Sequence, residues 1–177
     1  MNNNTANILN EGITVPNAGL VILNSYFLML FDRLNLVKNK TFITREAQLD
    51  AVHYLQYLVT GLEQTETSLL LLNKVLCGLA IDTPIQDHIS ISEENKTLMN
   101  GLIESAIAHW NAIGQTTING LRGNWLVREG MLIEQEDSWA LTVEKRPYDI
   151  LLMKSPFSFS IIKLPWMDKP LHVNWPY

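Results

Sequence analysis

The sequence contains one cysteine, Cys77, and four scattered histidines among its 177 residues. A single cysteine excludes an internal disulfide framework and suits a reducing compartment such as the cytoplasm. None of the histidines stands at metal-ligand spacing from another His, Cys or Asp, and there is no glycine-rich phosphate loop. The sequence therefore predicts no metal site and no cofactor, although a site assembled from distant residues leaves no trace in spacing.

Positive charge and long apolar runs are also scarce. The chain has 13 Lys and Arg against 18 Asp and Glu, a net charge of −5, which argues against a large nucleic-acid surface. Its most apolar run, residues 20–31, is shorter than the roughly 20 residues of a membrane-spanning helix. The first ten residues lack the basic and apolar regions of a signal peptide. We expect neither nucleic-acid binding nor stable membrane insertion.

The remaining composition is typical of a compact domain. Hydrophobic residues make up 47% of the chain and charged residues 18%. A chain of this length can bury a core without disulfides or metals. We predict a mobile lead-in over the Asn-rich residues 1–14 and a single globular domain over residues 15–177.

Helical periodicity dominates the chain as far as Gly130 and predicts about five helices. Thr44 and Ser92 are candidate N-caps, and Gly61 and Gly114 are candidate helix ends. The predicted helices run from Asn17 or Ala18 to about Leu36, from Thr44 to Gly61, from about Glu66 to Leu76, from Ser92 to Gly114, and from Thr116 or Thr117 to Gly130.

Beyond Gly130 the apolar period changes to two, which predicts a small antiparallel sheet. Residues 131–136 and 139–145 form a predicted hairpin, and residues 157–161 a third strand. A short helix over residues 148–153 follows Pro147. The predicted fold class is α+β, with the helical bundle packed on one face of this sheet.

The chain ends in an extended segment rich in proline and tryptophan, residues 161–175. Because proline removes a backbone donor, we expect this segment to be neither a helix nor a central strand. It is too apolar for a solvated tail. We favour an internal clasp in which Trp166 and Trp175 pack against the helices; a peptide ligand for a partner is the alternative.

Few side chains suggest chemistry. His53 and His109 lie on or beside apolar helical stripes and are expected to be hydrogen-bonded structural residues. Arg122 and Arg128 stand near the end of the fifth helix, where a guanidinium can satisfy terminal carbonyls or pair across the junction with the sheet. Asp149 has no partner in the local sequence.

Several blocks, taken in order, resemble the contractile injection system tape measure protein family, whose members are components of phage-tail-like particles. The blocks are residues 17–23, 31–34, 51–58, 60–61, 72–79, 108–110, 121–122, 128–130, 162–167 and 170–175. The resemblance implies a bacterial, non-enzymatic structural protein without a cofactor. It also implies cytoplasmic assembly into the particle, with tube, baseplate or spike proteins as partners, and self-association about the particle axis.

A molecular ruler works through length, and a helix rises only about 1.5 Å per residue. A globular domain of this size has a radius of gyration of about 16 Å. We therefore expect a short family member, or the globular module of a longer protein, that docks on tube or baseplate components. The candidate structural or interaction residues are Asn73, Lys74, His109, Trp110, Arg122, Arg128, Trp166 and Trp175.

One alternative is a small-molecule-binding or enzymatic α+β domain with a site assembled from His53, His109 and Arg122. That hypothesis requires the three side chains to meet in one concave pocket. Another alternative is an adaptor that presents its last three residues, Trp-Pro-Tyr, to a partner.

Overall fold

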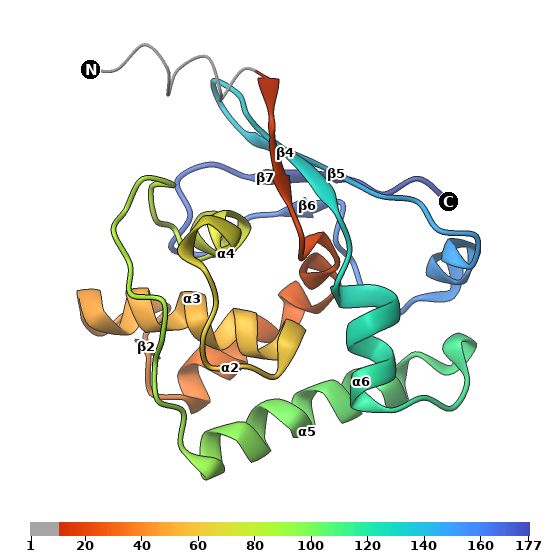
Figure 1. The fold of residues 1–177 in the computed structure, drawn as a ribbon, viewed down its shortest axis with the longest axis horizontal. Coiled ribbons are helices and arrows are strands. Elements are labelled where there is room, and N and C mark those ends of the chain that lie inside the picture. The colour runs from red at the N-terminus through yellow and green to blue at the C-terminus, as the bar shows by residue number, and fades with distance from the viewer. Residues whose placement is uncertain (1–10) are drawn as a thin grey trace.

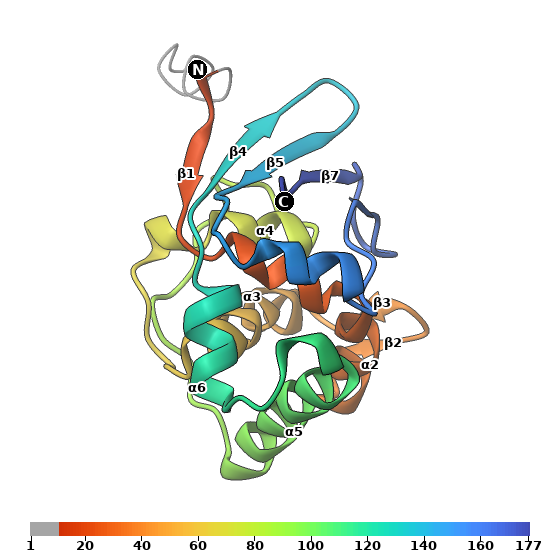
Figure 2. The same cartoon turned by 90° about the vertical axis from the view of Figure 1, so that its right-hand side faces the viewer.

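The computed structural model describes residues 11–177 and confirms the predicted α+β class. Figures 1 and 2 show the helices gathered on one side of a twisted sheet, with α5 farthest from it. The helices are α2 (Phe27–Arg33), α3 (Arg45–Thr60), α4 (Leu71–Leu76), α5 (Glu93–His109) and α6 (Ile118–Leu121). Shorter helical elements are η1 (Ala18–Tyr26), η2 (Thr67–Leu69), η3 (Asn111–Ile113), the π-helical turn η4 (Arg122–Leu126) and η5 (Asp149–Lys154).

Five strands form the main sheet in the order β1-β4-β5-β7-β6, and a separate hairpin joins β2 to β3. The strands are β1 (Ile13–Val15), β2 (Val37–Lys38), β3 (Thr41–Phe42), β4 (Gly130–Glu134), β5 (Trp139–Val143), β6 (Ile161–Ile162) and β7 (Leu171–Asn174). The β5–β7 pair is parallel and the other pairs are antiparallel, so the sheet is mixed and larger than predicted.

Local capping signals place α3 where the sequence predicts it. The Thr44 hydroxyl accepts a hydrogen bond from Ala47 N at 3.0 Å, and Gly61 ends the helix with φ +72°. The Ser92 hydroxyl caps α5 in the same way through Asn95 N, at 3.2 Å. Both predicted N-caps are confirmed.

The end of α5 and the first predicted helix need correction. The predicted helix up to Gly114 stops at His109, because the chain turns at Trp110 and buries that side chain completely. The predicted helix between Asn17 and Leu36 begins as the 3₁₀ helix η1 and becomes α-helical only in α2.

The predicted C-terminal ends of the fifth helix and of the lead-in both lie too far along the chain. The predicted fifth helix ends at Leu126 and not at Gly130, which already belongs to β4. The lead-in predicted for residues 1–14 includes Ile13 and Thr14, which pair with β4 in strand β1. Residues 1–10 lie outside the described part of the chain.

The prediction for the C-terminal strands is wrong in two respects. The third strand predicted over residues 157–161 is reduced to β6, which starts only at Ile161. The tail, expected not to supply a central strand, inserts β7 between β5 and β6. The proline rule holds locally, since Pro170 precedes β7 and contributes only its carbonyl, which accepts from Trp139 N at 2.8 Å.

The tail packs on the rest of the protein, as the predicted internal clasp requires. Trp166 Nε1 donates to the Leu76 carbonyl at the end of α4, at 2.8 Å, and its ring lies 5.5 Å from that of Phe31. Trp175 is 5% exposed. The side chains of the helices, the sheet and the tail share one hydrophobic cluster, which holds the C-terminal segment against the rest of the protein.

Candidate functional site

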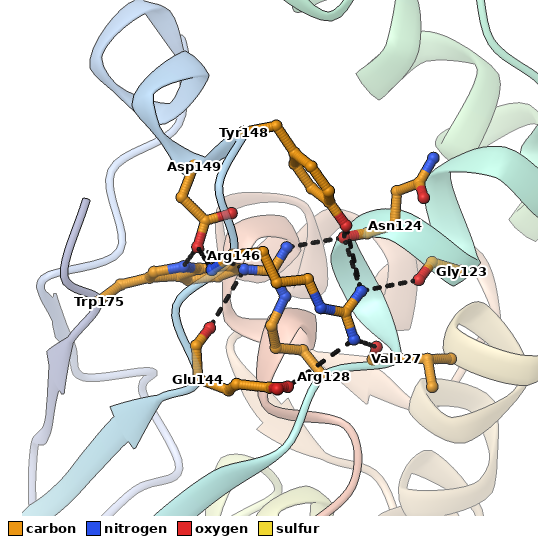
Figure 3. A network of polar contacts seen from close by, with 9 residues as sticks. All are labelled: Gly123, Asn124, Val127, Arg128, Glu144, Arg146, Tyr148, Asp149 and Trp175. Carbon is orange, nitrogen blue, oxygen red and sulfur yellow. Dashed lines mark hydrogen bonds and ion pairs between the residues drawn. The ribbon is translucent and has the colours of Figure 1, made fainter.

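The most concentrated polar arrangement is a buried ion pair at the junction of helices and sheet. Arg128 Nη1 lies 2.6 Å from Asp149 Oδ2, and both side chains are 0% exposed. Arg128 follows η4, and Asp149 begins η5 on the far side of the β4–β5 hairpin. The pair thus connects the end of one helical element to the start of another, as Figure 3 shows.

Aromatic rings surround the guanidinium of this pair. Arg128 Cζ lies 4.9 Å from the Trp175 ring centre, 5.5 Å from that of Trp125 and 5.6 Å from that of Tyr148. Trp175 also donates from Nε1 to Asp149 Oδ2 at 2.9 Å. The C-terminal tail therefore closes the junction with both a ring face and a hydrogen bond, and the rings add cation–π attraction to the ion pair.

A second arginine, Arg146, satisfies the carbonyls at the end of η4. Its Nη1 donates to Gly123 O at 3.2 Å and its Nη2 to Val127 O at 3.1 Å. Arg128 Nη2 donates to Asn124 O at 2.7 Å. The last carbonyls of a helical segment have no backbone partner within it, so the two guanidinium groups replace that partner here.

The pKa of Asp149 is lowered from its ordinary value. Burial alone would raise it, because a charged carboxylate loses its hydration. Hydrogen bonds to Asp149 Oδ2 from Arg128, the Arg146 backbone N–H and Trp175 favour the ionised form and outweigh burial. The Asp149 carboxylate is therefore ionised at neutral pH. Asp149 Oδ1 and Arg128 Nε, both buried, have no hydrogen-bond partner among the described residues.

A network of buried amides joins the first helical element to α3 and α4. Asn17 Nδ2 donates to Gln56 Oε1 at 2.9 Å and to Asn73 Oδ1 at 2.6 Å. Asn73 Nδ2 donates to Val52 O at 3.0 Å and to Gln56 Oε1 at 3.1 Å. Asn73, a candidate from the sequence, thus contacts its own fold. Buried amides with several mutual bonds fix the register of the elements that carry them.

Arg122 and Lys74 are likewise directed at backbone carbonyls. Arg122 Nε donates to Leu58 O at 3.0 Å and Nη2 to Tyr57 O at 3.2 Å, at the C-terminal end of α3. Lys74 is 5% exposed, and its Nζ donates to Ile81 O at 3.1 Å. Burial lowers the pKa of Lys74, partly opposed by Asp82.

His109 and Trp110 lie where α5 ends. His109 Nδ1 and the Tyr26 hydroxyl are 3.0 Å apart. The Trp110 ring lies 4.4 Å from that of Trp125, and Trp110 Nε1 donates to Leu151 O at 3.3 Å. Both candidates therefore contact neighbouring elements of the same chain.

The three side chains of the enzymatic alternative do not meet. His53, His109 and Arg122 line three different hollows of the surface. His53 Nε2 instead contacts the Gln86 carbonyl at 2.7 Å. Cys77 is 0% exposed, and burial raises the pKa of its thiol well above the ordinary value.

Asp149, Asn17 and Gln56 were missed by reasoning from the sequence. Asp149 is 21 residues from Arg128, and Asn17 is 56 residues from Asn73. No local periodicity or motif links such positions. One local signal was available for Asp149: it stands three residues after Arg146, with Pro147 between them. This spacing allows a tight turn in which the Arg146 N–H donates to Asp149 Oδ2, at a distance of 2.9 Å.

Within residues 11–177, no three His, Cys, Asp or Glu side chains are grouped as a metal site would require. Nor does the described part of the chain contain a helix that combines the length and apolarity of a membrane span. The arrangement defines an α+β domain whose most deeply buried polar groups connect its own elements.

Comparison with known families assigns this domain. The chain matches the family model of the contractile injection system tape measure protein over residues 2–175. Because the match covers nearly all 177 residues, the protein belongs to that family, as the ordered sequence blocks suggested. No curated protein and no solved structure matches the chain.

Proposed function

We propose that this protein is a non-enzymatic structural module that docks on tube, baseplate or spike components of a contractile injection particle. Family membership supports a role in the particle. The observation that carries the structural role is the Arg128–Asp149–Trp175 junction, which ties the C-terminal tail to both helical elements that flank the hairpin. We infer that this junction gives the described part of the chain, residues 11–177, fixed surfaces for docking.

The candidate polar residues support the same proposal. Arg122 is bound to α3 carbonyls, Lys74 to Ile81 and Asn73 to the amide network. A general acid, base or nucleophile must be able to reach a substrate, whereas these groups already have partners in the fold. We therefore propose that exposed residues of the domain, and not these buried polar groups, bind the other particle components.

The dimensions of the fold favour docking over length measurement. The longest helix, α5, has 17 residues and spans only about 25 Å. We propose that residues 15–177 act as one domain that anchors or positions other components. We also propose assembly in the cytoplasm and self-association about the particle axis, which light scattering on the purified protein tests.

The docking role is tested with purified proteins. The chain is immobilised, and the tube, baseplate, spike and sheath proteins of the same particle are passed over it one at a time. We expect saturable binding to a tube, baseplate or spike protein and none to the sheath, which serves as the control. Absence of binding to every component, with the immobilised chain shown to be folded by circular dichroism, would overturn the proposal.

A further inference from the structure

The N-terminal half of α3 and the loop between α4 and α5 enclose a surface hollow of about 510 Å³. Figure 1 shows this loop running past α3 on its way to α5. A second hollow of about 570 Å³ adjoins it and shares Asp50, Gln86 and Ile89 with it. The two hollows are continuous through these shared residues, and we call them together the α3 groove.

One face of α3 supplies one wall of the α3 groove. Glu46, Leu49, Asp50 and His53 all line it. Positions separated by three and four residues lie on the same side of a helix, so these four side chains form one continuous strip. The opposite wall offers the apolar side chains of Pro84, Ile85 and Ile89 beside the polar Gln86, and the second hollow adds Asp87, His88 and Ser90. The groove therefore combines an aliphatic lining with carboxylates.

The loop wall is held in place by hydrogen bonds. Ile89 N donates to Glu63 O at 3.2 Å, and Ile91 N donates to the Glu63 carboxylate at 2.6 Å. Thr65 N donates to Asp87 O at 2.9 Å. These bonds anchor the loop to the segment that follows α3, so the groove exists before any ligand arrives.

The carboxylates of the α3 groove lack cationic partners. Neither Glu46 nor Asp50 forms an ion pair anywhere in residues 11–177. The neighbouring Arg45 donates instead to Gln48 Oε1, at 3.1 Å. The face of α3 in the groove thus carries two carboxylates that have no ion-pair partner in the described chain.

His53 adds an acceptor to the same wall. It is 4% exposed, and its Nε2 lies 2.7 Å from the Gln86 carbonyl. A carbonyl oxygen only accepts, so Nε2 carries the proton and Nδ1 of the neutral ring is an acceptor. Nδ1 has no hydrogen bond from any described residue. Burial lowers the pKa of His53, which favours that neutral ring.

Asp50 has a pKa raised by burial, with a smaller opposing effect of His53 and a further increase from Glu46. A raised carboxyl pKa means that the ionised form is poorly compensated in its surroundings. A cation placed in the groove would supply that compensation.

We propose that the α3 groove is the docking site for a partner segment in which a lysine or arginine stands beside an aliphatic residue. Unpaired Glu46 and Asp50 receive the cationic head, while Leu49 and Ile85 receive the aliphatic stem and its neighbour. Long cationic side chains bind in this way, with the stem against apolar surface and the charge at its edge. The proposal rests on the docking function proposed above and names the face that performs it.

The first experiment measures binding of defined probes to the isotope-labelled protein by NMR. The probes are acetyl-Leu-Lys-Leu-amide, the matched acetyl-Leu-Glu-Leu-amide and butylammonium, at about pH 8, where histidine is neutral. We expect saturable amide shifts at Leu49, Asp50 and Ile85 with the lysyl peptide alone. No shift there, or equal shifts with the glutamyl peptide, would overturn the proposal. Equal affinity for butylammonium would also overturn it, because it would indicate a site for small cations.

Variants test the charge directly. Asp50→Asn keeps the shape of the side chain and removes its charge. We expect it to lower the affinity for the lysyl peptide about fivefold, which is the effect of one partly exposed ion pair. Asp137→Asn removes one exposed charge from the β4–β5 turn and should leave the affinity unchanged. Equal affinities of wild type and Asp50→Asn would contradict the proposed contact.

A second experiment separates this inference from the docking function itself. Gln86→Cys and Asp137→Cys variants are each labelled with a benzophenone maleimide, since Cys77 is buried, and are irradiated in assembled particles. We expect Gln86→Cys to cross-link to a tube, baseplate or spike peptide with Lys or Arg beside an aliphatic residue. Cross-links from Asp137→Cys alone would refute the groove and preserve the docking function. Cross-links from neither variant would also refute the groove, and the binding experiment on the immobilised chain would then decide the docking function.

Discussion

Arg128 shows what a fully buried charge requires from its surroundings. Its guanidinium is held by Asp149, by the Glu144 and Asn124 carbonyls and by the face of Trp175. A buried ion pair often adds little net stability over an apolar pair, because both ions lose their hydration. Removing one partner alone is different, since the other charge then stays buried without compensation.

Asp149→Asn tests this asymmetry with a side chain of nearly the same shape. We expect it to lower the free energy of unfolding by about 3 kcal/mol, because Arg128 remains buried without its counter-ion. Urea denaturation followed by circular dichroism measures the change. Glu144→Gln is the control: it removes a carboxylate from a partly exposed pair with Arg146 at 3.8 Å and should cost less than about 0.5 kcal/mol. Equal costs for the two variants would show that the buried pair has no special role.

The same carboxylate predicts a direction for the pH dependence. Since the folded-state pKa of Asp149 is lowered, its contribution is fully present above its unfolded value, near 3.8, and is lost as the pH falls through the folded value. The stability difference between wild type and Asp149→Asn should therefore be constant near neutral pH and shrink below about pH 4. Urea unfolding of both proteins at a series of pH values measures it. A difference that grows on acidification would contradict the lowered pKa.

Elements η1 and η4 approach each other closely at Gly19. A Cβ atom added at Gly19 would lie 1.6 Å from the Trp125 carbonyl oxygen, which belongs to backbone and cannot swing away. Gly101, in the middle of α5, has no atom within 4 Å of the corresponding position. Gly19 is therefore required by packing, whereas Gly101 shows only the intrinsic cost of a glycine inside a helix.

We expect Gly19→Ala to lower the free energy of unfolding by about 3 kcal/mol, because η1 must move away from η4. Gly101→Ala should instead stabilise the protein by about 0.5 to 1 kcal/mol, since alanine loses less entropy than glycine in a helix. Thermal unfolding measures both variants. A neutral Gly19→Ala would mean that η1 and η4 do not pack as closely as the structure shows.

Elements with local signals could be predicted from the sequence. The α3 and α5 starts follow from Thr44 and Ser92, whose hydroxyls cap the next turn, and the β4–β5 hairpin follows from apolar alternation. Strand β7 could not be predicted, because its place depends on pairing with β5 and β6 across the sheet. The prolines of the tail suggested that it could not form a central strand. The four residues of β7 contain no proline, so the strand forms between them.

In the buried junction too, one residue could be predicted from the sequence and its partner could not. Arg128 was a candidate because it stands near a predicted helix end, where carbonyls need donors. Its partner Asp149 was not, because only the folding of the hairpin brings η5 back to η4. The fold class depends on local patterns, whereas the ion pair depends on long-range topology, and one sequence records only the former directly.

For the molecule as a whole, the order of the sheet links the two ends of the chain. Strand β1 pairs with β4 at one edge, and the tail strand β7 completes the sheet by joining β5 to β6. Parallel and long-range pairings form late in folding, because the loop between the strands must first be closed. Because β7 lies inside the sheet between β5 and β6, we expect the tail to unfold together with the rest of the domain.

Deletion of residues 168–177 tests this conclusion. The deletion removes β7, leaves β6 without a partner strand and takes the Trp175 hydrogen bond from Asp149. We expect the truncated protein to show no cooperative thermal transition and no near-ultraviolet circular dichroism, because the buried Arg128–Asp149 pair becomes open to water. Deletion of Pro176 and Tyr177 alone, both exposed, should change stability by less than about 0.5 kcal/mol. If the longer deletion left a cooperative transition and abolished only binding to particle components, the tail would be a docking peptide, and the clasp would have to be abandoned.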